Sequence, residues 1–282
     1  MADAIAPSSG LALATEGLGF VYPDGTRALE GVDLRIAAGE QVALIGQNGS
    51  GKSTLVRHFD GLLRATTGRV LVGGEPVGQR HVADLAHLVG IVFQNPDRQI
   101  FAGRVRAEVA FGPRNLGMQG GELDERVTAA LQAVGLAGSE GVNPYDLGYS
   151  RRKLLGMASV LAMATPAVVL DEPTTGQDAR GVARVCEIVA RLAAAGRTVV
   201  TISHDMTFVA EVFPRLVVMR AGRVILDGPP AEVFAEANWP TLATTYLDPP
   251  LAAREGARVG LGSTPTEASL IAALAGRRER RP

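Results

Sequence analysis

The chain is poor in cysteine, and Cys186 is the one thiol among its 282 residues. A single cysteine can form neither a disulfide within the chain nor a thiolate metal cluster, so a disulfide-rich scaffold and a cysteine-based metal centre are excluded. We expect Cys186 to be a buried helix residue.

The chain also lacks a long apolar run and an excess of one charge. It has no stretch of about 18 uncharged apolar residues, and its start, MADAIAPSSG, lacks the basic-then-apolar order of a secretory signal, so we expect a cytoplasmic chain. The 28 basic and 29 acidic side chains give a net charge of −1. Because a nucleic-acid-binding surface needs a clear basic excess, we expect no nucleic-acid partner.

Lysine is scarcer still, since Lys52 and Lys153 are the only two lysines in the chain. Arginine cannot replace lysine as a compact point charge, so these two positions carry more information than usual. The chain is 46% hydrophobic, which is enough for one large core or two modest ones and excludes a disordered chain.

The apolar pattern predicts an α/β fold. Two roughly alternating runs, residues 11–22 and 28–36, flank the turn at Tyr22-Pro23-Asp24-Gly25 and predict an antiparallel hairpin. Continuous apolar runs at residues 42–45, 90–93, 167–170, 198–202 and 216–219 are typical of strands buried on both faces. Helical patterns at 52–63, 178–195 and 205–213 lie between or beside them, so we expect a mostly parallel sheet.

Two further segments organise the chain. Residues 95–164 have a helical pattern and predict a helical subdomain inserted into a main domain of residues 1–237. Residues 238–282 are rich in Pro, Gly and Ala, predict a short helix near 267–274, and end in RRERRP. We expect this C-terminal extension to finish in a solvated tail that includes Arg277, Arg278, Arg280 and Arg281.

A glycine-rich stretch follows the first buried strand and fits the pattern G-x-x-x-x-G-K-[ST]. Its glycines let backbone N–H groups point at phosphate oxygens, Lys52 reaches the β and γ phosphates, and Ser53 ligates magnesium. A chance match in a chain with 34 glycines is the alternative, and the strand before and helix after count against it. The predicted phosphate-binding residues are Gly46, Asn48, Gly49, Ser50, Gly51, Lys52, Ser53 and Thr54.

The strand at residues 167–170 ends in two carboxylates, Asp171 and Glu172. Asp171 at the strand tip suits the magnesium shell, and Glu172 suits activation of an attacking water. Two carboxylates after a strand can simply be a polar strand end. Their occurrence in the same chain as the phosphate loop favours a role in nucleotide binding and hydrolysis.

These motifs resemble, in order and over residues 11–235, the ATP-binding subunits of ATP-binding cassette (ABC) transporters, which are P-loop ATPases that use ATP and Mg²⁺. The resemblance implies that Tyr22 stacks on adenine, that Gln94 senses magnesium and the attacking water, and that His204 contacts the γ-phosphate. It places Asp178 in a loop that crosses a dimer interface. The alternatives are a hairpin-edge aromatic for Tyr22, a satisfied strand-end polar group for His204, and a helix N-cap for Asp178.

Two segments, residues 93–101 and 108–117, are similar to the ATPase subunits of energy-coupling factor (ECF) transporters, including the cobalt and nickel importers, as is the sequence LDPP at 247–250. In that group two ATPase subunits, as a hetero- or homodimer, drive a transmembrane coupling protein. A separate membrane protein captures a vitamin or a metal ion. The resemblance therefore implies a peripheral protein at the cytoplasmic face of the membrane, and it leaves the cargo open.

One departure from the family concerns the signature LSGGQ, where this chain has Leu147, Gly148, Tyr149, Ser150 and Arg151. In the family this loop caps the γ-phosphate bound by the opposite subunit through a serine hydroxyl and glycine N–H groups. Gly148 removes the hydroxyl and Tyr149 adds bulk, so we expect a weakened contact unless Ser150 substitutes. Loss of one preorganised donor typically costs about 10²- to 10³-fold in rate.

Three other functions remain open at this stage. A soluble ABC ATPase of DNA repair or translation would share the motifs, but usually has coiled-coil insertions or two cassettes. A small-molecule P-loop kinase would share only the phosphate loop. A mainly ATP-binding, regulatory half of a heterodimer would share every motif and leave most hydrolysis to its partner.

Overall fold

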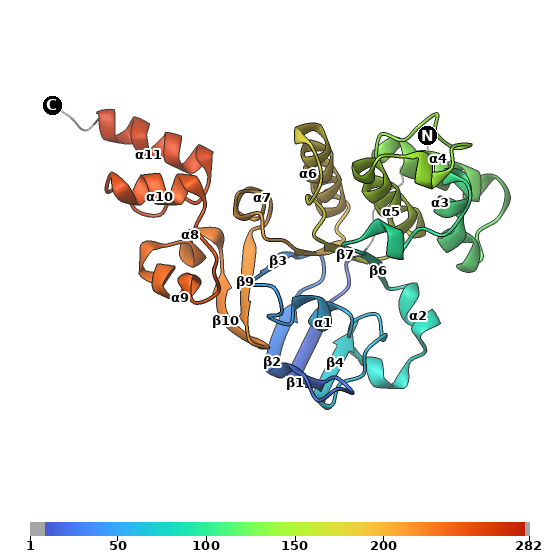
Figure 1. Ribbon diagram of the computed structural model, residues 1–282, viewed down its shortest axis with the longest axis horizontal. Coiled ribbons are helices and arrows are strands. Elements are labelled where there is room, and N and C mark those ends of the chain that lie inside the picture. Colours follow the sequence, from blue (N-terminus) through green and yellow to red (C-terminus); the bar gives the residue numbers. More distant parts are fainter. Residues whose placement is uncertain (1–8, 280–282) are drawn as a thin grey trace.

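The computed structural model describes residues 9–279 and builds them around two sheets (Figure 1). A four-stranded antiparallel sheet has the order β2-β1-β4-β5. Its strands are β1 (Leu13–Val21), β2 (Arg27–Ile36), β4 (Thr67–Val72) and β5 (Glu75–Pro76). The predicted hairpin is confirmed, because β1 and β2 pair antiparallel with Leu13 opposite Ile36 and Phe20 opposite Leu29.

The second sheet has six strands in the order β10-β9-β3-β8-β7-β6. All neighbours in it are parallel except the β9–β10 pair, as the buried apolar runs predicted. Its strands are β3 (Gln41–Ile45), β6 (Val89–Val92), β7 (Ala167–Asp171), β8 (Thr198–Ile202), β9 (Arg215–Arg220) and β10 (Arg223–Gly228).

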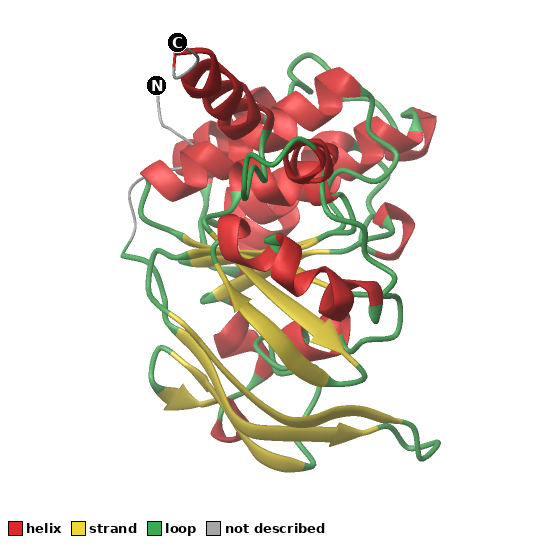
Figure 2. Ribbon diagram, turned by 90° about the vertical axis from the view of Figure 1, so that its left-hand side faces the viewer, coloured by secondary structure: helices red, strands yellow, loops and turns green. Residues whose placement is uncertain are grey.

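Alternate residues of the central strands face two different cores. On β3, Ala43 and Ile45 pack into the core beneath the helices, whereas Val42 and Leu44 pack into the core toward the antiparallel sheet. Figure 2 shows the same layering, with most helices on one side of the six-stranded sheet and the antiparallel strands on the other. A strand that is buried on both faces has no polar alternation, which is why these strands read as continuous apolar runs.

Helices replace strands between β6 and β7, as predicted for residues 95–164. This region holds the short 3₁₀ turns η2 (Pro96–Arg98) and η3 (Pro144–Asp146) and the helices α3 (Val105–Asn115), α4 (Gly120–Ala133) and α5 (Tyr149–Met163). The remaining helices on this side are α6 (Ala179–Ala194) and α7 (Met206–Val212). In Figure 1, α3, α4 and α5 lie at one end of the molecule and the C-terminal helices at the other.

The C-terminal residues are more helical than the sequence predicted. They form α8 (Pro230–Val233), η4 (Glu236–Asn238), α9 (Trp239–Ala243), α10 (Leu251–Arg258) and α11 (Glu267–Glu279), of which only the last was expected. Among the described residues, no helix is both long enough and apolar enough to cross a membrane. Arg280 and Arg281 of the predicted basic tail lie outside the described residues.

Several local predictions were wrong. The helix after the phosphate loop, α1 (Lys52–Val56), stops well short of residue 63. Beyond it the α-helical hydrogen bonds give way to turns closed between residues i and i+3, such as His58 N to Leu55 O at 3.1 Å. Gly61 then has a φ of 75°, which is not helical. Cys186 lies on α6 but is only half-buried. The sequence also missed the short elements η1 (Val77–Gln79) and α2 (Val82–Ala86).

Candidate nucleotide site

The carboxyl ends of the parallel strands bring the predicted site residues to one edge of the six-stranded sheet. In the strand register, Leu44 lies opposite Ile202, Asp171 opposite Ile202, and Val92 opposite Leu170. The segments that follow these residues therefore emerge side by side. They are the phosphate loop after β3, Glu172 after β7, His204 after β8, and Gln94 after β6. Such an edge is where ligands bind in open α/β sheets.

The phosphate loop needs glycine at two positions for steric reasons. Gly46 has a φ of 147°, and a Cβ there would lie 2.2 Å from the carbonyl oxygen of Met219. Gly51 has a φ of 102°, and its Cβ would lie 2.7 Å from Ala28 O. Gly49 also has a positive φ, 78°, but it faces open space together with exposed Asn48. The loop is thus packed at its base and open at its tip, where a ligand can approach.

Lys52 lies inside this loop. Its Nζ donates hydrogen bonds to Gly46 O at 2.7 Å, to Gln47 O at 2.9 Å and to Ser50 Oγ at 3.3 Å. Burial lowers the pKa of this ammonium, while the Glu172 and Asp171 carboxylates oppose that shift. A buried ammonium held only by neutral oxygens is matched to an incoming phosphate, whose negative charge would compensate it.

Ser53 and Asp171 bring a hydroxyl and a carboxylate side by side. Ser53 Oγ donates to Asp171 Oδ2 at 3.1 Å, although the two residues are far apart in sequence. Burial raises the pKa of Asp171, so this carboxylate would gain from a cation beside it. A hydroxyl and a carboxylate at this distance fit Mg²⁺, which prefers a few protein oxygens together with waters and substrate phosphates. Within the described residues, no cluster of three or more His, Cys, Asp or Glu forms a separate metal site.

Glu172 is held between β7 and β8. Its carboxylate accepts a hydrogen bond from His204, with Nδ1 2.7 Å from Oε2, and its backbone N donates to Ile202 O at 2.8 Å. Its φ of 52° lies in the left-handed region, which is rare for a residue with a side chain. Glu172 is buried whereas the His204 side chain is 64% exposed, so the pair points from the sheet edge toward the open side of the site.

Of the remaining predicted site residues, Tyr22 and Asp178 make defined hydrogen bonds, whereas Gln94 is exposed to solvent. The Tyr22 hydroxyl lies 2.9 Å from Thr54 Oγ1, and its ring meets Phe20 edge-on, which ties the β1–β2 turn to α1. Gln94 is exposed, and none of the hydrogen bonds given for the described residues joins it to Ser53 or Asp171. Asp178 caps α6 by accepting from Gly181 N at 2.8 Å, so the N-cap interpretation is confirmed.

The segment at residues 147–151, which we call the signature segment, opens α5 with Gly148 as its N-cap and no side-chain capping bond. Ser150 Oγ donates to Gln177 Oε1 at 2.6 Å, and Gln177 Nε2 donates back to Ser150 O at 3.1 Å. A Cβ on Gly176 would lie 2.7 Å from the Tyr149 ring, so that ring packs directly on the glycine. The signature segment is therefore fastened to loop 172–178 of its own chain.

The sequence assigned no role to two residues near the site, Gln177 and Lys153. Lys153 is buried at 2% exposure and donates to the main-chain oxygens of Glu172 and Thr175. The scarcity of lysine marked Lys153 as an informative position, but it did not indicate these contacts.

Comparison with known proteins agrees with this geometry. The model of the ABC transporter family matches residues 29–175. The energy-coupling factor transporter ATP-binding protein EcfA of Methanocaldococcus jannaschii is 42% identical over 226 residues, covering 79% of this chain and 81% of that protein. A putative ABC transporter ATP-binding protein of Streptomyces avermitilis is 44% identical over 220 residues, covering 78% and 83%.

A solved structure gives the same answer for the fold. The structure of cbiO1 from Clostridium perfringens, described as part of the ABC transporter complex cbiONQ, superposes with a TM-score of 0.72 at 36% identity and covers 82% of this chain and 94% of that one. The chain belongs to the ABC transporter family of ATP-binding proteins, and it is an ABC-type ATPase. The predicted fold and the predicted likeness to ECF-type ATPases are both confirmed.

Proposed function

We propose that the chain is the ATP-hydrolysing subunit of an ECF-type membrane importer, where it couples binding and hydrolysis of Mg-ATP to uptake of a vitamin or a transition-metal ion. The relatives named above support the transporter class. One observation supports the assignment to an importer. An apolar groove on the surface is lined by both segments that resemble ECF ATPases, residues 93–101 and 108–117.

In this proposal the site residues divide the work of ATP hydrolysis. The phosphate loop, with Lys52, holds the phosphates, and Tyr22 stacks on adenine. Ser53 and Asp171 would hold Mg²⁺, with Gln94 as a further oxygen ligand, and the bound ion would supply charge neutralisation at the phosphates. Glu172 accepts a proton from the attacking water, and His204 keeps that carboxylate oriented and contacts the γ-phosphate. Asp178 and the signature segment face the nucleotide across a dimer interface.

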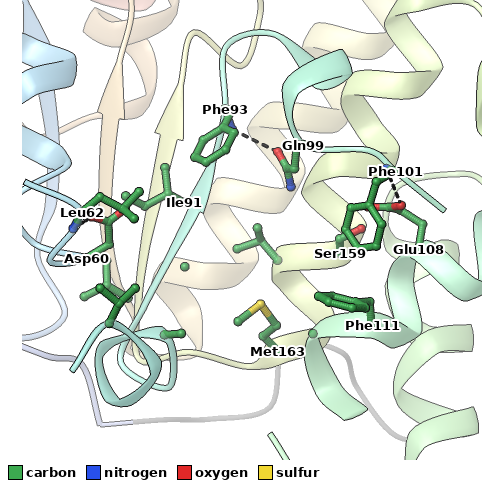
Figure 3. A pocket seen from close by; sticks show the side chains of 16 residues that line it. Asp60, Leu62, Ile91, Phe93, Gln99, Phe101, Glu108, Phe111, Ser159 and Met163 are labelled. Atoms are coloured by element: carbon green, nitrogen blue, oxygen red, sulfur yellow. Dashed lines mark hydrogen bonds between the residues drawn. The ribbon is translucent and has the colours of Figure 1, made fainter. Parts of the chain in front are cut away.

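The groove has a volume of about 250 Å³ and lies between β6, α3 and α5 (Figure 3). Phe101 and Phe111 stand at one side of it, 60% and 48% exposed, with their rings edge-to-face at 4.6 Å. Glu108 fixes the chain behind them by accepting from the backbone N of Phe101 at 3.1 Å and of Ala102 at 2.8 Å. Exposed aromatics over a rigid apolar groove suit an amphipathic helix of a partner. We assign this groove to a cytoplasmic helix of the transmembrane coupling protein, which would place the chain at the cytoplasmic face of the membrane as a peripheral subunit.

The signature segment favours a heterodimer. The chain keeps Lys52, Asp171, Glu172 and His204, so its own ATP can be hydrolysed when a partner supplies an intact signature. The partner's ATP would meet Gly148 and Tyr149 instead, and would turn over slowly. A homodimer would carry this defect in both sites.

Isolation of the chain from its native membrane tests the proposal. We expect mass spectrometry of the eluate to find a second ABC ATPase with an intact LSGGQ and two membrane proteins, one of them the substrate-capture protein. The eluate should hydrolyse ATP. Recovery of the chain alone, or with ribosomes or DNA, would support a soluble ABC ATPase instead.

The groove can be tested in the same experiment. Phe111→Asp should release the membrane proteins while leaving ATP binding and the ATPase partner in place. Val142→Asp is a matched control, since Val142 is also an exposed apolar side chain of the helical region but does not line the groove. Equal release by both variants would remove the groove from the proposal.

A further inference from the structure

Lys153 is a buried cation to which the proposed reaction gives no role. It lies on α5, is 2% exposed, and its Nζ donates to the main-chain oxygens of Glu172 and Thr175, the latter at 3.0 Å. Both acceptors belong to loop 172–178. Lys153 therefore joins the helix that begins at the signature segment to the residue proposed as the general base.

The backbone of Glu172 is the reason this contact matters. Its φ of 52° is a conformation that side-chain-bearing residues avoid and that persists only when surrounding contacts fix it. Two neutral hydrogen bonds help to fix the Glu172 backbone. They run from Glu172 N to Ile202 O at 2.8 Å and from Thr175 N to Glu172 O at 3.3 Å. The bond from Lys153 has an ionised donor, and such bonds are about twice as strong as neutral ones.

The charges around Lys153 point the same way. Burial lowers the pKa of its ammonium to about 8, and the carboxylates of Glu172 and Asp171 oppose that shift. The two carboxylates therefore favour the charged form of this ammonium. Burying an ammonium is costly unless it is paired and hydrogen-bonded, and here loop 172–178 supplies its partners.

We propose that Lys153 is a positioning residue for ATP hydrolysis: it holds the main chain of Glu172 in the left-handed conformation that directs the carboxylate toward His204 and the attacking water. This inference rests on the proposed function, because it takes Glu172 as the base. Lys153 touches neither nucleotide nor water in this role. It acts only through Glu172.

Lys153→Met tests the role, because the side chain stays unbranched and only one atom shorter but cannot donate a hydrogen bond. The helix stays attached to loop 172–178 through Ser150–Gln177 and through Tyr149 on Gly176, so the variant should fold. In the full complex we expect kcat for ATP to fall on the order of 10- to 100-fold, since small displacements of catalytic groups have such effects. KM for ATP should change less than about twofold, because Lys153 does not contact the nucleotide.

Arg184→Gln is a control, since it removes a cation from α6 whose partner Glu187 is exposed. It should leave both kinetic constants unchanged. Lys153→Gln is a second variant, whose uncharged amide can donate only neutral hydrogen bonds, and it should also lower kcat. Loss of cooperative thermal unfolding in both Lys153 variants would overturn the proposal, because the role would then be structural.

A double-mutant cycle separates positioning from other roles. If Lys153 acts through Glu172, then adding Lys153→Met to Glu172→Gln should not lower the single-turnover rate any further. An equal loss on both backgrounds, or a KM that rises in step with the fall in kcat, would overturn the positioning role. Full activity of Lys153→Met alone overturns this inference only, whereas full activity of Glu172→Gln overturns the proposed function on which it rests.

Discussion

His204 Nδ1 lies 2.7 Å from Glu172 Oε2, and this hydrogen bond joins the residues that follow two neighbouring strands, β8 and β7. It connects a buried carboxylate to an imidazole that is mostly exposed. In the role proposed for Glu172, a base that acts on water needs its acceptor oxygen fixed in direction, and the bond from His204 would supply that constraint from the open side of the site.

Replacing Glu172 with glutamine should separate nucleotide binding from hydrolysis. The amide keeps the size of the side chain and can still bond to His204, but it cannot accept a proton from water. We expect unchanged ATP affinity and a fall in kcat of about 10²-fold or more, as for loss of a general base. Equilibrium binding and steady-state ATPase assays measure the two effects, and gel filtration should show a dimer that persists with ATP.

The same variant separates an active subunit from a regulatory one. If the chain hydrolyses ATP during transport, uptake into vesicles should stop with Glu172→Gln. Uptake that barely changes would mean that the chain mainly binds ATP and that its partner performs the hydrolysis. Arg184→Gln, on the exposed face of α6, is the control that should leave uptake intact.

Lys52→Ala should lower the affinity for ATP, in contrast to Glu172→Gln, which should lower the hydrolysis rate. Lys52 Nζ fills the phosphate loop by donating to Gly46 O and Gln47 O, and removing it leaves no cation there for the β and γ phosphates. Charge-assisted hydrogen bonds contribute about 1.5 to 3 kcal/mol each, so we expect ATP affinity to fall by roughly tenfold to a hundredfold. Titration with a fluorescent ATP analogue measures this, and wild-type affinity would contradict the role given to Lys52.

Much of this site was predictable because its strands are buried on both faces. Strands such as β3, β7 and β8 appear in the sequence as short apolar runs, and the polar residues that end them mark the sheet edge directly. Ser53, which follows β3, then lies 3.1 Å from Asp171 at the end of β7. No local pattern gives this contact; it depends on both strands pairing in parallel with β8 between them, so that their carboxyl ends share one sheet edge.

The missed elements have a common physical cause. Strands β4 and β10 are partly exposed, and each has only three consecutive apolar residues beside Arg and Gly, which is too short a run to indicate a buried strand and shows no clean alternation. In the turn before β10, Ala221 has a φ of 46° and Gly222 a φ of 76°. Hairpin turns with two positive φ angles usually contain Asn-Gly or Asp-Gly, and this turn has neither pair, so the sequence does not indicate it. The contacts of Lys153 and Gln177 depend on how α5 packs across loop 172–178, and tertiary placement of this kind is not encoded in local spacing.

Restoring the signature segment should raise turnover of a dimer made of this chain alone. Gly148→Ser returns the hydroxyl, and adding Tyr149→Gly with Ser150→Gly returns the close backbone approach. We expect the triple variant to hydrolyse ATP about 10²- to 10³-fold faster than the unmodified chain, the effect of one preorganised donor. The steady-state rate of the purified chain measures it, and adding Glu172→Gln should abolish the gain. An ordinary transporter-like rate in the unmodified homodimer would disprove the asymmetry.

Asp60 should make the stability of the isolated chain depend on pH. Its side chain is 9% exposed at the edge of the groove, and burial raises its pKa from an ordinary value near 3.8 to about 6, although Leu62 N and Arg57 pull it back. The folded chain therefore binds the proton more tightly than the unfolded chain. Stability from this group is greatest below about pH 4 and declines as pH rises to about 6.

Asp60→Asn should remove that decline, because the amide carries no charge and can still accept from Leu62 N. Each unit of pKa difference corresponds to about 1.4 kcal/mol, so the variant should exceed the wild type by up to about 3 kcal/mol at pH 7 and by little at pH 4. Urea unfolding between pH 4 and pH 8 measures the difference. Asp84→Asn, at an exposed position on α2, is the control, because it removes a carboxylate that is not buried. A constant difference for Asp60→Asn would mean that the buried carboxylate is ionised throughout this range.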